Sequence, residues 1–428
     1  MKEDNRKIGL LGAISIGIGG MVGGGIFAVL GEAISLAHGA TYIAFLVAGL
    51  VALLTSYSYA KLSVTYQNRG GTVVFINKAF KHKLLSGSIN VLLWLSYLVT
   101  IALYASAFAS YGATFFHGVS ADWLAHILVS VAIILPALIN LVSSSFVSKS
   151  ESFIVSIKII LLLVIIVSGF SFVDKNNLSI SQWESPLAIV SAGMIIFVAY
   201  EGFELIANAA EEIKEPKKNL PRAFYGSVIF VIILYILISI VTVGAVDEAQ
   251  LINAKDYALA VAAKPALGQL GFSIVAVAAL LSTFSAINAT IYGNARLGYF
   301  LAKEGELPSV LSKEKKDIPQ DGIYITTLFS LVIANSIELT EIAIIASAGF
   351  LLIFAVVNIS AFKLKKEIQA NGVILGLATI SSLSALVLLL EHTYKKDVRA
   401  VIVFVGFIIF SIMFEVIYGY FIRKRLAL

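Results

Sequence analysis

Long apolar segments separated by short polar connections fill almost the whole chain. A transmembrane helix needs roughly 20 predominantly apolar residues, and twelve segments of about that length can be counted. They lie at residues 9–36, 41–66, 84–116, 122–144, 150–171, 186–210, 222–246, 268–302, 322–337, 340–363, 371–391 and 398–422. No connection is long enough to hold a soluble domain. The pattern therefore predicts an all-α polytopic membrane protein with twelve transmembrane helices.

Composition agrees with this class and excludes several others. The 428 residues are 59% hydrophobic and only 13% charged, a balance that soluble domains of this size do not have. Outer-membrane barrels alternate apolar and polar residues, which these unbroken runs do not. The first apolar segment is too long, and the N-terminus too charged, for a cleaved signal peptide. The absence of cysteine excludes disulfides and thiolate metal sites.

The distribution of Lys and Arg predicts how the chain is oriented in the membrane. With the N-terminus inside and twelve alternating spans, 24 of the 31 basic residues fall in inner segments and six in outer ones. Cytoplasmic loops carry such an excess of basic residues. We therefore expect both termini in the cytoplasm, and the net charge of +5 reflects these loops rather than binding of nucleic acid.

The first span has an unusual centre, Gly17–Phe27, which reads GIGGMVGGGIF. Each glycine inside a helix costs on the order of 1 kcal/mol relative to alanine, and six glycines here predict a broken helix. Non-helical backbone at membrane depth is tolerated where it is buried in protein or lines a polar cavity. The alternative is close helix packing, because two GxxxG pairs, Gly19…Gly23 and Gly20…Gly24, are also present.

The sixth span repeats this peculiarity in the opposite orientation. Pro186 opens it, and Glu201, Gly202 and Glu204 lie near its middle. Carboxylates inside a membrane are costly and indicate a functional site, although a hydrogen bond to a neighbouring helix, or for Glu201 an exposed vestibule, would also explain them. Corresponding interruptions in two inverted halves, spans 1–5 and 6–10, are typical of the substrate site of a secondary transporter.

The two helix ends at the first break offer opposite charges to a ligand. The half-helix that starts near Ile26 presents unpaired N–H groups to an anion, and the half that ends near Gly19 presents carbonyls to a cation. A small zwitterion, with a carboxylate and an ammonium on one carbon, fits both. Hydroxyls on span 8 usually bond to their own helix, and the seven-residue repeat of Tyr97, Tyr104 and Tyr111 is more typical of packing.

The residues of both breaks resemble the amino acid–polyamine–organocation transporter superfamily. The more specific match is Phe197–Arg222, FVAYEGFELIANAAEEIKEPKKNLPR, and the similarity covers the whole chain. Within the superfamily the chain is most similar to archaeal proton-coupled, broad-specificity amino acid transporters. The resemblance implies a five-plus-five inverted-repeat (LeuT-like) core with discontinuous helices 1 and 6 and two extra helices. The implied parts are residues 1–171, 172–366 and 367–428.

The resemblance also implies a set of substrate contacts between helices 1, 3, 6 and 8. The implied contacts are Ile18, Gly19, Gly20, Gly23, Gly24, Gly25, Phe197, Ala199, Tyr200 and Gly202, mostly through the backbone. Val198 stands where some exchangers carry an aromatic gate, which favours smaller neutral substrates. Glu204 matches a carboxylate of some members, so a proton-linked role is expected there, and Glu201 is a second candidate.

Lys158, inside span 5, is the expected site of energy coupling. A lysine near the bilayer centre costs at least about 2.5–3.5 kcal/mol, unless its stem extends to the headgroups. In the implied fold, helix 5 lies beside helices 1 and 8, where sodium-coupled relatives hold an ion. The ammonium would replace that ion. Its expected partners there are Gly19, Ser282, Thr283 and Ser285.

These observations predict a secondary active transporter that imports small neutral L-amino acids with protons and needs no cofactor. An exchanger of cationic amino acids or polyamines is the first alternative, favoured by Glu201 and Glu204. An enzyme is the remote one, because His38, His82, His117, His126 and His392 form no ligand spacing. The sequence contains no filter-like motif, so a channel is not favoured. We expect a multi-pass protein of the cell membrane, and the oligomeric state stays open.

Overall fold

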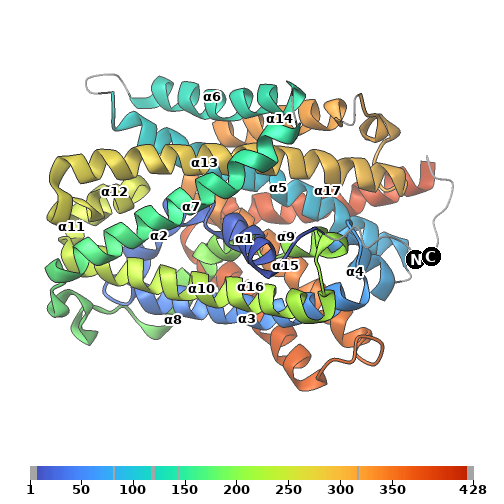
Figure 1. The fold of residues 1–428 in the computed structure, drawn as a ribbon, viewed down its shortest axis with the longest axis horizontal. Coiled ribbons are helices and arrows are strands. Elements are labelled where there is room, and N and C mark those ends of the chain that lie inside the picture. The colour runs from blue at the N-terminus through green and yellow to red at the C-terminus, as the bar shows by residue number, and fades with distance from the viewer. Residues whose placement is uncertain (1–6, 81, 117–120, 143, 316–317, 422–428) are drawn as a thin grey trace.

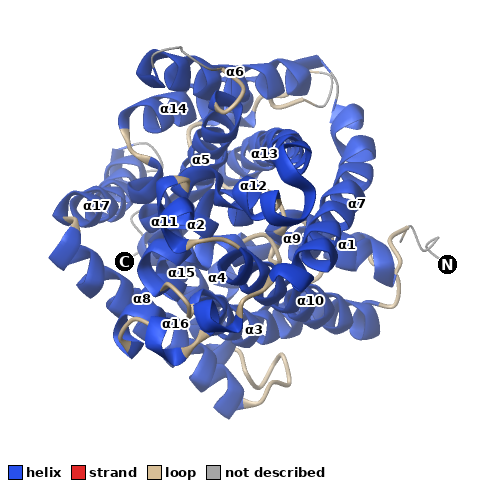
Figure 2. Ribbon diagram, turned by 90° about the vertical axis from the view of Figure 1, so that its left-hand side faces the viewer, coloured by secondary structure: helices blue, strands red, loops and turns tan. Residues whose placement is uncertain are grey.

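The computed structural model describes residues 7–80, 82–116, 121–142, 144–315 and 318–421. Within these ranges the chain is helical, and its β-type pairing is limited to isolated bridges, such as that between Ile8 and Ile213. Figure 2, coloured by secondary structure, contains helices and loops only. The all-α class predicted from the apolar pattern is therefore confirmed.

The helices follow the predicted spans closely. The first half of the chain contains α1 (Leu10–Met21), α2 (Gly25–Ala37), α3 (Thr41–Thr65), α4 (Gly71–Ala79), α5 (Lys83–Ala113), α6 (Ala121–Val142) and α7 (Ser144–Gly169). The middle contains α8 (Pro186–Ile195), the 3-10 helix η4 (Ile196–Tyr200), α9 (Leu205–Asn208), α10 (Pro216–Ala245), α11 (Glu248–Asn253), η6 (Lys255–Tyr257) and α12 (Ala258–Ala262). The last part contains α13 (Lys264–Lys303), α14 (Gln320–Ser336), α15 (Leu339–Lys363), α16 (Gly372–Lys396) and α17 (Val398–Phe421).

The number of membrane spans is close to the predicted number without reaching it. Ten helices of the described chain are long and apolar enough to cross a membrane, and α1 and α2 together make up to eleven. The ninth predicted span is α14, which has 17 residues and is not among these helices. The chain is a multi-pass membrane protein, and the count of twelve is not confirmed.

The helices form a bundle with a buried centre and an apolar rim. Long helices such as α10 and α13 run along the horizontal axis of Figure 1, and Figure 2 views the bundle from one end. Helices α5, α8 and α15 are mostly covered by protein, whereas α6, α7, α16 and α17 turn many side chains outward. These outward side chains are largely Leu, Ile, Val and Phe, as expected for a surface that faces lipid.

Both predicted interruptions are present in the structure. The first span bends by 49° between α1 and α2, and the break covers residues 22–24. The predicted end of the first half near Gly19 is two residues early, because Gly19 and Gly20 still belong to α1. The sixth span leaves α-helical geometry after Ile195 and regains it only at Leu205.

The two breaks touch each other through glycine backbone. A Cβ added at Gly20 would lie 2.6 Å from the carbonyl oxygen of Gly202, and one added at Gly202 would overlap the backbone of Gly20. Gly202 also has φ = +117°, a conformation that L side chains rarely adopt. Neither position therefore admits a side chain without moving the two spans apart.

Some predictions concern residues outside this description. The basic residues Lys2, Arg6, Lys81, Lys316, Arg423, Lys424 and Arg425, and His117, lie outside the described residues, as does the side chain of Lys149. The orientation of the termini stays a prediction, and so does the division of the chain into two inverted repeats and a C-terminal part at residues 171 and 366. The connection between the seventh and eighth predicted spans contains the short helices α11, η6 and α12.

Gly202→Ala tests the contact between the two broken spans. The positive φ and the overlap with Gly20 should destabilise the protein by more than about 1 kcal/mol, which lowers the midpoint of thermal denaturation in detergent. Gly376→Ala is the matched control, because nothing lies within 4 Å of a Cβ at that helical position. Equal denaturation midpoints for the two variants would contradict the close approach of the two spans.

Candidate functional site

A cavity lies where the two broken spans meet. It has a volume of about 60 Å³, and its walls come from both breaks and from the neighbouring helices α5 and α13. Its lining residues are Gly19, Gly20, Tyr97, Tyr104, Glu201, Gly202, Leu205, Ala286, Ala289 and Thr290. A buried water needs about 10–15 Å³ of such space, so the cavity holds only a few waters. A ligand larger than this requires wall side chains to move.

Two buried carboxylates dominate the electrostatics of the cavity. The Tyr104 hydroxyl donates to Glu201 at 3.3 Å. Glu204 accepts from the Tyr97 hydroxyl at 3.1 Å and from the backbone N–H of Gly202 at 2.7 Å. None of the ten lining residues is Lys, Arg or His. The site therefore combines acidic side chains with neutral hydroxyl and amide donors.

Side chains from surrounding helices satisfy the backbone groups that the breaks release. The Ser347 hydroxyl of α15 donates to the Ile195 carbonyl at 2.5 Å and accepts from the Val198 N–H at 3.0 Å. The Tyr235 hydroxyl of α10 lies 2.7 Å from the Met21 carbonyl and 3.2 Å from the Ala199 carbonyl. A buried backbone group without a partner costs about 1–3 kcal/mol, so these side chains stabilise both breaks.

The predicted substrate residues divide into two groups. Gly19, Gly20 and Gly202 line the cavity, together with Glu201. The others surround the breaks without lining it: Ile18, Gly23, Gly24, Gly25, Phe197, Ala199 and Tyr200. Their role in binding stays a prediction.

Several residues of the second group have contacts of their own. Gly24 leaves space for the Tyr104 ring, which a Cβ would overlap. Gly25 packs on the backbone of Ala199, at 2.8 Å from an added Cβ. The Phe197 ring packs on Phe354, with centroids 5.9 Å apart. The glycines thus fix the positions of side chains and backbone around the cavity.

The residues predicted to couple transport to protons lie on α7 and α13, apart from Gly19 on α1. A Cβ added at Gly19 would lie 2.9 Å from Val155 of α7, and Lys158 follows one turn further on, with 3% of its surface exposed. Lys158 is therefore covered by protein rather than extended along the lipid. The Ser282 hydroxyl donates to the Gly23 carbonyl at 2.6 Å, whereas the Thr283 hydroxyl bonds to its own helix. Ser285 is buried on the same helix.

Sequence reasoning misses half of the cavity wall. It assigns Tyr97 and Tyr104 to packing, yet their hydroxyls reach Glu204 and Glu201. A signal is present, because hydroxyls seven residues apart on a membrane helix form a polar stripe on one face. Ala286 and Ala289 are small apolar residues on an apolar helix, and nothing in their pattern distinguishes them from packing.

An ion pair covers α2 at the end remote from the break. Lys255 of η6 bonds to Glu32 of α2, and Thr340 of α15 completes the cluster, with its hydroxyl 2.9 Å from Lys255 Nζ and 3.0 Å from Glu32 Oε2. Gly31 packs so closely on the backbone of Lys255 that no Cβ would fit. The connection between α10 and α13 therefore covers α2 at the end predicted to be extracellular.

A polar cavity between two interrupted membrane helices is the arrangement of a secondary transporter. The family model described as amino acid permease matches residues 8–427, so the chain belongs to this family. It is 34% identical over 421 residues to the uncharacterized protein MJ0609 of Methanocaldococcus jannaschii, with 97% of each chain covered. It is 33% identical over 410 residues to the inner membrane transport protein YbaT of Escherichia coli, with 96% of this chain and 95% of the relative covered.

A solved structure supports the fold independently. A mutant of the manganese transporter of Eremococcus coleocola superposes with a TM-score of 0.57 at 12% sequence identity, covering 96% of this chain and 94% of the other. At that identity the likeness concerns the fold alone. The family identifies a transporter rather than an enzyme, and it indicates transport of amino acids.

Ser347→Ala tests the support of the sixth-span break. Loss of the hydroxyl leaves the Val198 N–H and the Ile195 carbonyl without this partner, so stability should fall by about 1–3 kcal/mol. Ser360→Ala is the matched control on α15, because Ser360 is equally buried but bonds to its own helix at Val356. Thermal denaturation in detergent measures both variants. A Ser360→Ala loss as large as that of Ser347→Ala would contradict the supporting role.

Proposed function

We propose that this protein imports small neutral L-amino acids across the cell membrane by proton-coupled symport. The observation that supports this most directly is the cavity at which the backbones of Gly19, Gly20 and Gly202 meet. Backbone groups recognise the parts common to all amino acids, and a small cavity leaves little room for a long side chain. Broad specificity for small substrates follows from both properties.

The charges around the cavity suit a zwitterion. The N-terminal end of α2 begins at Gly25, and no side chain caps it. Uncapped N–H groups and the helix dipole favour a carboxylate at this end. The carboxylates of Glu201 and Glu204 and the nearby carbonyls favour an ammonium group. One amino acid placed between them would satisfy both ends.

An exchanger of cationic amino acids or polyamines is the alternative that one observation favours. Glu201 lines the cavity and Glu204 lies beside it. None of the lining residues carries a basic side chain that could neutralise these carboxylates. Two carboxylates would attract a substrate that carries more than one positive charge. The two hypotheses differ in whether the α-carboxylate of the substrate is required.

Uptake by purified protein in liposomes distinguishes the two hypotheses. Small neutral L-amino acids should compete with one another for uptake of labelled alanine, since each presents the same carboxylate and ammonium to the broken helices. Putrescine and other amines without a carboxylate should not compete. Strong competition by polyamines together with weak competition by alanine-like substrates would instead support the exchanger.

The proposed proton coupling depends on Lys158. Its helix, α7, packs against α1 at Gly19, next to the first break. Here the ammonium would take the place that a sodium ion occupies in sodium-coupled transporters of related fold. Release and uptake of its proton during the cycle would then couple transport to the proton gradient.

Lys158→Ala tests this assignment directly. Wild-type uptake should follow an inward proton gradient and should not depend on sodium, whereas Lys158→Ala should lose uptake or lose its dependence on the gradient. Lys264→Ala is a suitable control, because Lys264 lies over the ring of Phe272 at the start of α13 and does not line the cavity. Sodium-driven uptake that Lys158→Ala retains in full would refute the assignment.

A further inference from the structure

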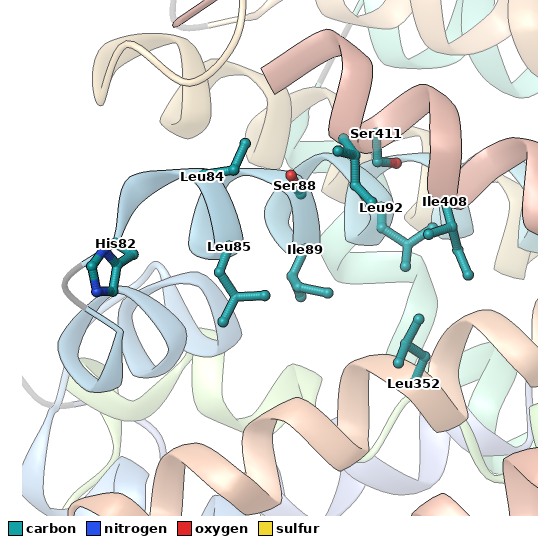
Figure 3. Close-up of a pocket in the computed structure, with 10 residues that line it drawn as sticks. His82, Leu84, Leu85, Ser88, Ile89, Leu92, Leu352, Ile408 and Ser411 are labelled. Atoms are coloured by element: carbon teal, nitrogen blue, oxygen red, sulfur yellow. The ribbon is translucent and has the colours of Figure 1, made fainter. Parts of the chain in front are cut away.

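A second, much larger cavity opens at the surface of the bundle. It has a volume of about 660 Å³ and lies between α5, α15 and α17 (Figure 3). Its lining residues are His82, Leu84, Leu85, Ser88, Ile89, Leu92, Leu352, Ile408, Ser411 and Ile412. None of them lines the cavity between the broken spans. We refer to this feature as the α5 groove.

The walls of the α5 groove are apolar and belong to membrane spans. In Figure 3, Leu85 and Ile89 point from α5 into the space that Leu352 enters from α15 and Ile408 borders from α17. All three helices are long and apolar enough to cross a membrane. The surroundings of the groove are therefore hydrocarbon, and an acyl chain fits its walls better than water would.

Basic residues lie at one end of the groove. It reaches His82, where α5 starts, and Lys83 is the first residue of that helix. No side chain caps this N-terminus, so its first N–H groups and the helix dipole favour an anion. Lys363 of α15 is a further basic side chain in this part of the bundle, with its Nζ 4.1 Å from the ring centroid of Phe80.

A polar side chain inside the groove points to a ligand with oxygen atoms. Ser88 is 5% exposed and lines the groove, and its hydroxyl has no hydrogen-bond partner among the described residues. Ser88 lies five residues beyond Lys83, which is about 7.5 Å along the helix. Glycerol oxygens of a lipid would lie at this depth if its phosphate were bound at the helix N-terminus.

Two acidic side chains contact α5 near this level: Glu306, which accepts from the Asn90 amide at 2.7 Å, and Glu415 of α17. Glu415 packs so closely on Gly87 that a Cβ there would overlap its carboxylate, and it is 3% exposed. Neither carboxylate is one of the lining residues of the groove, whereas His82 is, with Lys83 next to it in the chain.

We propose that the α5 groove binds one phospholipid, with an acyl chain along α5 and the phosphate at the N-terminus of this helix. Lys83 and His82 hold the phosphate, and Ser88 donates to a glycerol oxygen. Basic pockets between membrane helices bind anionic headgroups in this way. The lipid would contact the same helix that carries Tyr97 and Tyr104, and the same α15 that carries Ser347.

Native mass spectrometry of the full-length protein in detergent tests the groove. Dioleoyl phosphatidylglycerol is titrated onto delipidated protein, and wild type should retain one molecule at low lipid excess. Ile89→Trp fills the groove and should reduce the bound fraction at least fivefold, as should Ile408→Trp from the opposite wall. Ile402→Trp is the matched control, because Ile402 is 65% exposed on α17 and outside the groove. Equal retention by wild type and both groove variants would overturn the proposal.

A second comparison tests the headgroup site. Lys83→Gln should weaken retention of phosphatidylglycerol severalfold and leave retention of dioleoylglycerol, which lacks the phosphate, unchanged. If wild type retains dioleoylglycerol as well as it retains phosphatidylglycerol, the phosphate site is wrong. If wild type is a dimer that Ile89→Trp dissociates without any change in lipid retention, the groove is an interface between copies and the proposal fails.

Discussion

The direct contact between Gly20 and Gly202 constrains the centre of this protein. Two membrane spans can meet at bilayer depth with non-helical backbone only if no side chain separates them, and both positions exclude a Cβ. This approach places Glu201 beside α1 and brings the two sets of released backbone groups to one cavity. The other wall residues of the cavity lie on α5, α9 and α13, which surround this crossing.

Backbone carbonyls that the two breaks leave without a helical partner accept hydrogen bonds from side chains of other helices. Ser347 on α15, Tyr235 on α10 and Ser282 on α13 each bond to a carbonyl at a break. Because the supporting groups lie on three different helices, the geometry of the cavity depends on the whole bundle. A change in the position of any of these helices alters which backbone groups are available to a ligand.

The parts of this site that could be predicted from the sequence are the two breaks, which follow from the backbone preferences of glycine. Six glycines in one span, and Gly202 between two carboxylates in another, disfavour continuous membrane helices, so both breaks could be located to within a few residues. Side-chain walls were harder to predict. Tyr97 and Tyr104 have the spacing of ordinary packing residues, and only the three-dimensional positions of the carboxylates give their hydroxyls a function. Ala286 and Ala289 matter because they leave space, and the absence of a side chain has no periodic signal.

Helix α2 is held by contacts at two points along its length. Gly25, the first residue of the helix, packs on Ala199, and Glu32, five residues before its end, is bonded to Lys255. Gly25 and Glu32 are about 10 Å apart along the helix axis, and a helix of this length does not bend easily. A displacement of α2 at Gly25 would therefore be transmitted to the ion pair at Glu32. The backbone contact at the break and the ion pair at Glu32 are thus joined through one short helix.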